Sequence, residues 1–203
     1  MPVRSGERLD PAATRERILA VAEDVFYRRG IHAVGVADIA EAAGASKASI
    51  YKNFTSKEGL VEATLRYRSD RVREWLEQGS ADVPLGRDRI LRIFDLLTGW
   101  YAEDDFRGCA LVSAAAEDRV RDGAPRSLAR AHLQVYRAMF VESLQAMGVD
   151  DPQGLAGRLV VLLEGATVVS AIDGDPGIGP DARAVAEEWL SSTTARTEAP
   201  PHY

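Results

Sequence analysis

The sequence predicts an all-α fold of about nine helices. Apolar residues recur at the i, i+3, i+4 spacing of amphipathic helices, whereas the alternation of a half-buried β-strand is absent. Glycine and proline gather between the periodic segments, as turn-forming residues do between helices. A chain of 203 residues that is 46% hydrophobic and 28% charged is long and apolar enough to form a packed soluble core.

The first predicted helix runs from Pro11 to about Arg29. Asp10 can cap its N-terminus, proline is favoured at the first helical position, and Gly30 ends it. Its apolar positions have the spacing of a core-facing stripe. They are Ile18, Leu19, Ala22, Val25 and Phe26.

Three further helices follow in the first part of the chain. One is predicted from Val36 to Ala43 and, after the glycine turn at Gly44, another from Lys47 to about Phe54. Thr55 to Glu58 has the Thr-x-x-Glu spacing of a capping box, which predicts the start of a long helix ending near Gln78.

The long helix and the predicted helices that follow it form a larger second domain. The helices after the long one are Arg87–Glu103, Arg107–Arg121, Ala124–Met147, Pro152–Ile172 and Asp181–Ser192. A linker from Gly79 to Gly86 precedes them, and a loop rich in Gly, Asp and Pro from Asp173 to Pro180 precedes the last helix. We expect a first domain of residues 1–56 and a second of residues 57–203.

Composition disfavours several classes of protein. No apolar run approaches the roughly 20 residues of a membrane helix, and the first ten residues are polar, so a cytoplasmic protein without a membrane partner is expected. The single cysteine, Cys109, excludes an internal disulfide framework. Neither ligand spacing around the three histidines nor a paired acid–base constellation is present, so we predict no metal site, no catalytic site and no cofactor.

The charge is distributed unevenly. The net charge is −6, yet all three lysines, Lys47, Lys52 and Lys57, lie in one short stretch. This clustering favours a phosphate-facing patch in the first domain, although lysines also occur by chance on a solvated surface.

Residues 36–54 have the pattern of a helix-turn-helix motif, in which the second helix enters the major groove of DNA. On a wheel of 100° per residue, Ile50 and Phe54 face inward together and are expected to pack on the first helix. The outer face and its flanks then contain Lys47, Ala48, Ser49, Tyr51, Lys52 and Asn53. Small, hydroxyl and basic side chains suit base edges and phosphates, although an ordinary amphipathic helix also has a polar surface.

Two segments resemble the TetR family of regulators. They are TRERILAVAEDVFYRRG, residues 14–30, and VADIAEAAGASKASIYKNFTSKEGL, residues 36–60. The resemblance implies that Val36, Ala37, Ser46, Lys47, Ala48, Ser49, Tyr51, Lys52, Asn53 and Lys57 contact double-stranded DNA. Valine stands at position 36 where the family often has threonine, so its backbone N–H rather than a hydroxyl would serve there.

The resemblance also implies a helical body that dimerises through its last two long helices and encloses a small-molecule inducer pocket. The segment FRGCALVSAAAED, residues 106–118, resembles part of that body in a large subset of the family. The predicted helix 152–172 is apolar nearly all round, so it should be buried on more than one side, in a homodimer interface as well as in the core. A two-fold dimer would match a palindromic operator.

The candidate ligand-binding residues are small, aromatic or isolated polar side chains on shared helix faces. They are Phe94, Leu97, Trp100, Cys109, Val112, Ser113, Ala116, Tyr136, Phe140, Leu163, Glu164 and Thr167. The alternative is an ordinary core, to which residues of these types more often belong. Glu164 stands out, because a carboxylate within an apolar helix could bind a cationic or hydroxylated ligand or pair with an arginine across the interface. Cys109 could be a redox sensor or inert packing.

The sequence therefore predicts a DNA-binding transcriptional regulator. We expect it to act as a repressor that a small-molecule ligand releases from its operator. Two alternatives stay open at this point. One is a DNA-binding regulator without an inducer, and the other is an all-helical enzyme.

Overall fold

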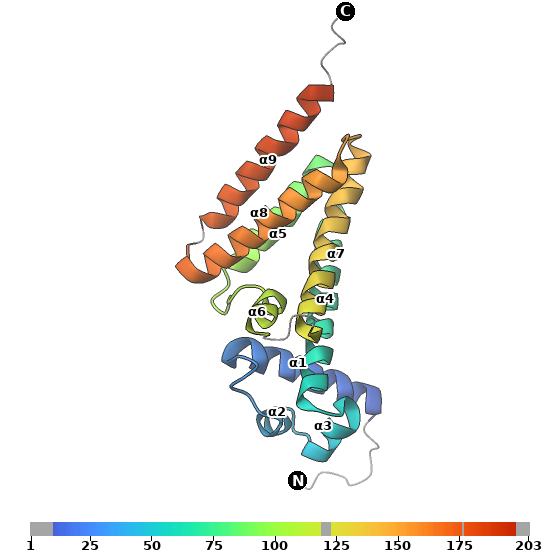
Figure 1. The fold of residues 1–203 in the computed structure, drawn as a ribbon, viewed down its shortest axis with the longest axis vertical. Coiled ribbons are helices and arrows are strands. Elements are labelled where there is room, and N and C mark those ends of the chain that lie inside the picture. The colour runs from blue at the N-terminus through green and yellow to red at the C-terminus, as the bar shows by residue number, and fades with distance from the viewer. Residues whose placement is uncertain (1–9, 119–122, 176, 198–203) are drawn as a thin grey trace, which may run out of the picture. The chain divides into compact units, whose positions relative to one another are not determined.

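A computed structural model of the chain describes residues 10–118, 123–175 and 177–197. Within those ranges the chain forms nine helices and no strand, which confirms the predicted all-α class (Figure 1). Contacts divide the chain into two compact units, which we call the head, ending at Arg68, and the body, beginning at Ser69. The head therefore includes the first turns of the fourth helix, whereas the functional boundary after residue 56 stays a prediction.

The head is built from α1 (Pro11–Arg29), α2 (Val36–Ala42), α3 (Lys47–Phe54) and the start of α4 (Lys57–Ser80). Helix α1 packs on α2, and α2 packs on α3. The Asp10 carboxylate accepts a hydrogen bond from the Ala12 N–H at 3.0 Å, as expected of the predicted cap. The predicted apolar stripe of α1 is buried except for the half-buried Val25.

A buried ion pair ties the beginning of α4 to α1. Arg68 Nη1 donates to Glu23 Oε1 at 2.7 Å, and both side chains are largely shielded from solvent. The same guanidinium lies 4.4 Å from the centroid of the Tyr27 ring, in the geometry of a cation–π contact. These contacts explain why Arg68 belongs to the head.

The body contains the rest of α4 and five further helices. They are α5 (Arg87–Tyr101), α6 (Ala110–Glu117), α7 (Ala124–Ala146), α8 (Pro152–Asp173) and α9 (Ile178–Thr197). Helix α5 packs on α7, α8 and α9, and α7 also packs on α6 and α8. Phe94 and Phe140 stack at the centre of this core with ring centroids 6.0 Å apart.

Salt bridges fasten α9 to α5 at the edge of the body core. Arg183 pairs with Asp95 of α5 at 2.7 Å and with Glu187 one turn further along α9 at 3.0 Å. Glu187 also accepts a hydrogen bond from Arg87 of α5. Figure 1 shows α9 beside α8 and α5.

Several helix ends differ from the sequence expectation. Helix α6 begins at Ala110 rather than Arg107, because Gly108 has φ +84° and Cys109 is extended. Its predicted end at Arg121 lies outside the described residues. Helix α9 begins at Ile178, inside the predicted loop, because Pro180 occupies one of the first positions, where its missing N–H removes no helical hydrogen bond.

Helix α8 corrects one expectation about membranes. By length and composition it is apolar enough to cross a bilayer, contrary to the prediction that no segment is. Only two of the 21 residues before its terminal aspartate are charged, Arg158 and Glu164. One face of α8 is buried in the body, as in the core helix of a soluble protein.

The N-terminal cap of α8 yields a first testable prediction. The Asp151 carboxylate accepts a hydrogen bond from the Gly154 N–H at 2.8 Å. Asp151→Ala should lower the free energy of unfolding by about 1 kcal/mol, because one N–H group of the first turn loses its acceptor. Urea denaturation measures the change. The exposed neighbour Asp150 is the control, because it caps no helix. Equal effects of Asp150→Ala and Asp151→Ala would contradict the capping role.

Candidate nucleic-acid interface and ligand site

Helix α3 has one buried face and one exposed face, as the wheel predicts. Ile50 is fully buried and Phe54 is 5% exposed, and the Arg15 guanidinium of α1 lies 5.1 Å from the Phe54 ring centroid. On the opposite side, Tyr51 is 50% exposed. The other exposed residues of this helix are Lys47, Ala48 and Lys52. The head therefore presents a row of small, aromatic and basic side chains to solvent.

The turn before α3 positions this face. Gly44 has φ +59°, a conformation that glycine adopts without strain, and the Ala45 N–H donates to the Ala40 carbonyl at 2.9 Å. The Ser46 hydroxyl oxygen then accepts a hydrogen bond from the Ser49 N–H at 3.1 Å and caps α3. The chain thus reverses tightly between α2 and α3, as a helix-turn-helix motif requires.

Two predicted contact residues are engaged within the helix. Asn53 Nδ2 donates to the Ser49 carbonyl at 2.8 Å, and both side chains are half-buried. Both side chains are less exposed than those of Tyr51 and Lys52, and their contact with DNA stays a prediction.

At the start of α2, the side chain of Val36 is 9% exposed, whereas Ala37 is exposed. Because the Val36 side chain is buried and has no hydroxyl, only its backbone N–H is left for a phosphate contact. Nearby, the Gly35 N–H donates to the Asp38 carboxylate at 2.7 Å, which lowers the pKa of that carboxyl, and the charge of Arg29 lowers it further. Asp38 therefore stays ionised and holds the first turn of α2 in place.

The connection between α3 and α4 was only partly predicted. Ser56, rather than Thr55, caps α4, because its hydroxyl accepts the Gly59 N–H at 3.0 Å. Thr55 instead has φ +66°, a strained value for a β-branched residue. A Cβ on Gly59 would lie 2.1 Å from the Phe54 carbonyl oxygen, so only glycine permits this close approach. Together these residues place Lys57 in the first turn of α4, as predicted.

The predicted ligand residues fall into two groups. Most lie in or against the body core, with Phe94, Leu97, Tyr136, Phe140 and Leu163 inside it and Trp100 packed against it. Cys109 and Thr167 are buried and Val112 is half-buried. Ser113 and Ala116, in contrast, are exposed on α6, because that helix buries Leu111 and Ala114 instead. Whether any of the twelve contacts a ligand stays a prediction.

Sequence reasoning missed Tyr101, which organises the polar part of this core. Thr167 donates to the Leu163 carbonyl at 2.9 Å, and the Tyr101 hydroxyl lies 2.8 Å from Thr167 Oγ1 and 3.4 Å from the Leu163 carbonyl oxygen. Burial raises the pKa of Tyr101 to about 12. The sequence pattern indicates its neighbour Trp100 as a ligand residue. Tyr101 is recognised as a polar residue of the core only from its contacts with Leu163 and Thr167 of α8.

Glu164 is the most unusual group in the body. Each of its carboxylate oxygens exposes less than 1 Å² and has no hydrogen-bond partner among the described residues. Burial raises the pKa of this carboxyl to about 7, because the charged form is poorly solvated there. Its charge also contributes to the raised pKa of Tyr101, so the two side chains are electrostatic neighbours.

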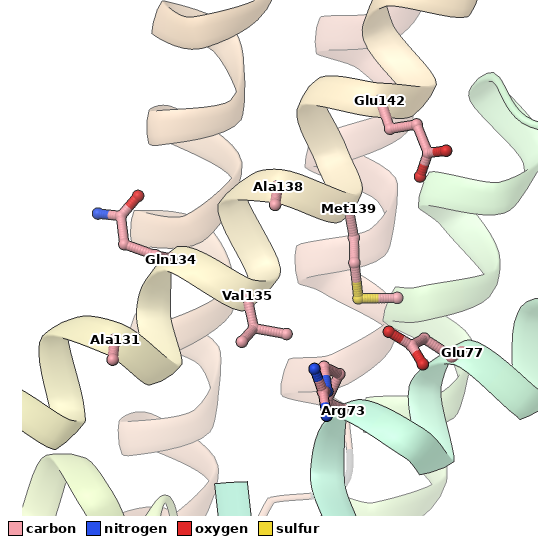
Figure 2. Close-up of a pocket in the computed structure, with 8 residues that line it drawn as sticks. All are labelled: Arg73, Glu77, Ala131, Gln134, Val135, Ala138, Met139 and Glu142. Carbon is pink, nitrogen blue, oxygen red and sulfur yellow. The ribbon is translucent and has the colours of Figure 1, made fainter. Parts of the chain in front are cut away.

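A separate groove of about 570 Å³ lies between α4 and α7 and is open to solvent. Met139 extends from α7 toward Glu77 of α4, and Arg73 faces the same space (Figure 2). The remaining lining residues are Ala131, Gln134, Val135, Ala138 and Glu142. None of them was predicted from the sequence, because an exposed groove between two helices leaves no periodic signal.

The chain is all-helical, and its head exposes the second helix of a helix-turn-helix motif. These features are typical of helix-turn-helix transcriptional regulators. The model of "Bacterial regulatory proteins, tetR family" matches residues 18–64. The HTH-type transcriptional activator FasR of Mycolicibacterium smegmatis is 32% identical over 109 residues, which are 54% of this chain and 49% of that protein. The HTH-type transcriptional repressor KstR2 of the same organism is 45% identical over 56 residues, 28% of this chain and 27% of that protein.

The chain thus spans about half, or less, of the length of these two curated relatives. The fold match is more extensive. The TetR-family regulator SCO4454 from Streptomyces coelicolor superposes with a TM-score of 0.82 at 25% identity, over 89% of this chain and 96% of that one. The head thus matches the TetR family model, and the chain shares the fold of TetR-family transcriptional regulators. Members of this family bind DNA operators and usually act as dimers.

Proposed function

We propose that this chain binds a palindromic DNA operator in the cytoplasm as a homodimer and that a small molecule releases it. The exposed face of α3 is the observation that carries the DNA-binding part. Ala48 is small enough for the backbone to approach base edges, while Lys47, Lys52 and the Tyr51 hydroxyl can reach phosphates. The first turn of α4 adds Lys57 beside backbone N–H groups that favour an anion.

The proposed dimer interface is the outer face of α8 together with α9. Val161 and Ile172 are 74% and 77% exposed, and Val168 and Val169 lie on the same side of the helix. An apolar face of this kind on a soluble protein favours a partner surface. Two-fold pairing would place two α3 helices for successive major grooves, which lie about 34–36 Å apart along B-DNA.

The proposed control mechanism is a shift between two body conformations. A ligand that prefers the conformation with wrongly spaced heads would reduce operator affinity. Helix α4 includes residues of both head and body, so it is the natural element to transmit the change. We propose repression because it is the usual mode of the family, although the similar proteins include an activator as well as a repressor.

Two alternatives are weaker. A regulator without an inducer would not explain why the buried carboxylate of Glu164 has no hydrogen-bond partner. An all-helical enzyme would need paired acid and base groups or an activated nucleophile, and the sequence pattern indicates neither. The similar proteins are transcriptional regulators rather than enzymes.

Gel-shift titration with the DNA upstream of the protein's own gene tests the proposal. We expect a specific complex whose affinity falls steeply with salt concentration, because phosphate contacts release counterions. A small-molecule screen on that complex then separates ligand-controlled from uncontrolled regulation. Binding no tighter than to unrelated DNA, on this and other candidate operators, would refute the DNA-binding assignment.

Lys57→Gln is expected to weaken operator binding about threefold to tenfold. The substitution removes one cation at the first turn of α4, so the slope of log affinity against log salt should fall by about one. Lys57 makes no described ion pair, and the fold should persist. An unchanged salt slope would place Lys57 outside the phosphate contacts.

A further inference from the structure

Glu164 lacks a structural reason to be a carboxylate. Burying an unpaired ionised carboxyl is costly, and proteins usually pair such a group or replace it. No Lys, Arg or His of the described residues lies within 4.0 Å of it. A glutamine or leucine would fill the same position of α8 without this cost, so the charge itself needs an explanation.

The neighbouring hydroxyls do not serve as its partners. Thr167 donates to the Leu163 carbonyl, so the Tyr101 hydroxyl is left to donate to Thr167 Oγ1 or to that carbonyl. Both hydrogens are therefore committed elsewhere. The titratable group that interacts with Glu164 from another element is Tyr101 of α5, which Cys109 before α6 also influences, and neither Tyr101 nor Cys109 is a cation. The other charged residues of α8 are exposed.

Tyr101, whose hydroxyl contacts the residues on either side of Glu164 in α8, belongs to a cluster of aromatic rings. The Trp100 and Phe106 ring centroids are 4.7 Å apart and nearly perpendicular, and the Tyr101 and Phe106 centroids are 5.2 Å apart. Ring faces and a single carboxylate attract an organic cation. A divalent metal ion would instead require several oxygen ligands, and a neutral alcohol would not compensate the buried charge.

We infer that Glu164 and the aromatic cluster of Trp100, Tyr101 and Phe106 form the binding site for an organic cation of the arylalkylamine class. The inference deepens the proposed function, because it names the chemistry of the effector that the body would sense. The ammonium group pairs with Glu164, and the hydrocarbon part packs against the rings.

Binding exchanges a proton for the cation. In the ligand-free chain the carboxylate oxygens are closed off from solvent, and protonation of Glu164 avoids the cost of a buried charge. Phe106 packs against Trp100 and Tyr101, so we expect the segment 102–109 to move when the ligand enters. Because the pKa of Glu164 is raised to about 7, affinity for the cation should rise about tenfold between pH 6 and pH 8.

Calorimetric titration with two probes of similar size tests the site. Benzylamine is a cation near neutral pH, and benzyl alcohol is its uncharged counterpart. We expect the wild-type chain to bind benzylamine at least about tenfold more tightly than benzyl alcohol and to release protons, detected as a heat that depends on the buffer. Glu164→Gln should abolish the preference. Glu142→Gln, which neutralises an exposed carboxylate in the α4–α7 groove, should leave it unchanged.

Any of the following results would overturn the inference. They are equal affinity for the two probes, an unchanged preference in Glu164→Gln, and loss of the preference in Glu142→Gln, which would place the cation in the groove. A lower dimer stability of Glu164→Gln in sedimentation experiments would also overturn it, because Glu164 would then pair across the subunit interface. Operator binding, measured on the same samples, tests the proposed function separately.

Discussion

Ala48→Glu is expected to reduce operator affinity at least about 100-fold, equivalent to about 2.7 kcal/mol of binding free energy. Ala48 lies on the exposed face of α3, between the lysines at positions 47 and 52. A glutamate there would occupy the space through which the backbone approaches the bases and would place a negative charge close to the phosphates. Gel-shift or anisotropy titration at fixed salt concentration measures the loss.

The folded state should tolerate this substitution, because residue 48 is exposed and glutamate is favourable within a helix. Circular dichroism and thermal unfolding verify that the fold persists. Ala131→Glu is the matched control, since Ala131 is an exposed alanine of the body helix α7. Its operator affinity should stay within about threefold of the wild-type value. Equal losses in the two variants would mean that overall charge, rather than the α3 face, determines affinity.

The head could be predicted in detail because its chemistry is local. The caps at Asp10 and Ser46, the turn at Gly44 and the inward positions of Ile50 and Phe54 all depend on residues within one or two turns of one another. The start of α4 was harder to predict. Both Thr55 and Ser56 can cap a helix, and the positive φ of Thr55 became apparent only with the structure.

The body was less predictable because its polar groups meet across long sequence distances. The hydrogen bond between Tyr101 and Thr167 joins residues 66 positions apart, and no periodicity marks such a pair. The face of α6 was also misjudged. Ser113 and Ala116 were grouped with Cys109 by residue type, but the helix begins only after Cys109 and turns both of them toward solvent.

The position of Glu164 was predicted, but its isolation was not. The sequence indicated an unusual carboxylate in an apolar helix, and it allowed a ligand or an arginine as partner. The structure adds that both oxygens are buried and that the nearest hydroxyls are engaged elsewhere. Because of this isolation, the free energy of unfolding should depend on the ionisation of Glu164.

Glu164→Gln is expected to stabilise the ligand-free protein at alkaline pH. The wild-type carboxyl has a pKa near 4.5 when unfolded and about 7 when folded. The contribution of this carboxyl to the free energy of unfolding is complete below pH 4.5, where it is protonated in both states. The contribution is lost as the pH rises to about 7, because the carboxyl ionises in the unfolded state before it ionises in the folded state. The loss approaches about 3 kcal/mol. Glutamine does not titrate, so the variant should lack this loss.

Urea denaturation at fixed protein concentration, between pH 5 and pH 8, measures the difference in the free energy of unfolding. The advantage of Glu164→Gln over wild type should grow by about 2–3 kcal/mol across that range, whereas Glu142→Gln should differ from wild type by a nearly constant amount. Saturating benzylamine should reverse the trend for the wild type alone, because the cation stabilises the ionised carboxylate. A difference that is constant with pH would mean that Glu164 titrates normally, and its burial would then have to be relieved by a partner in the dimer.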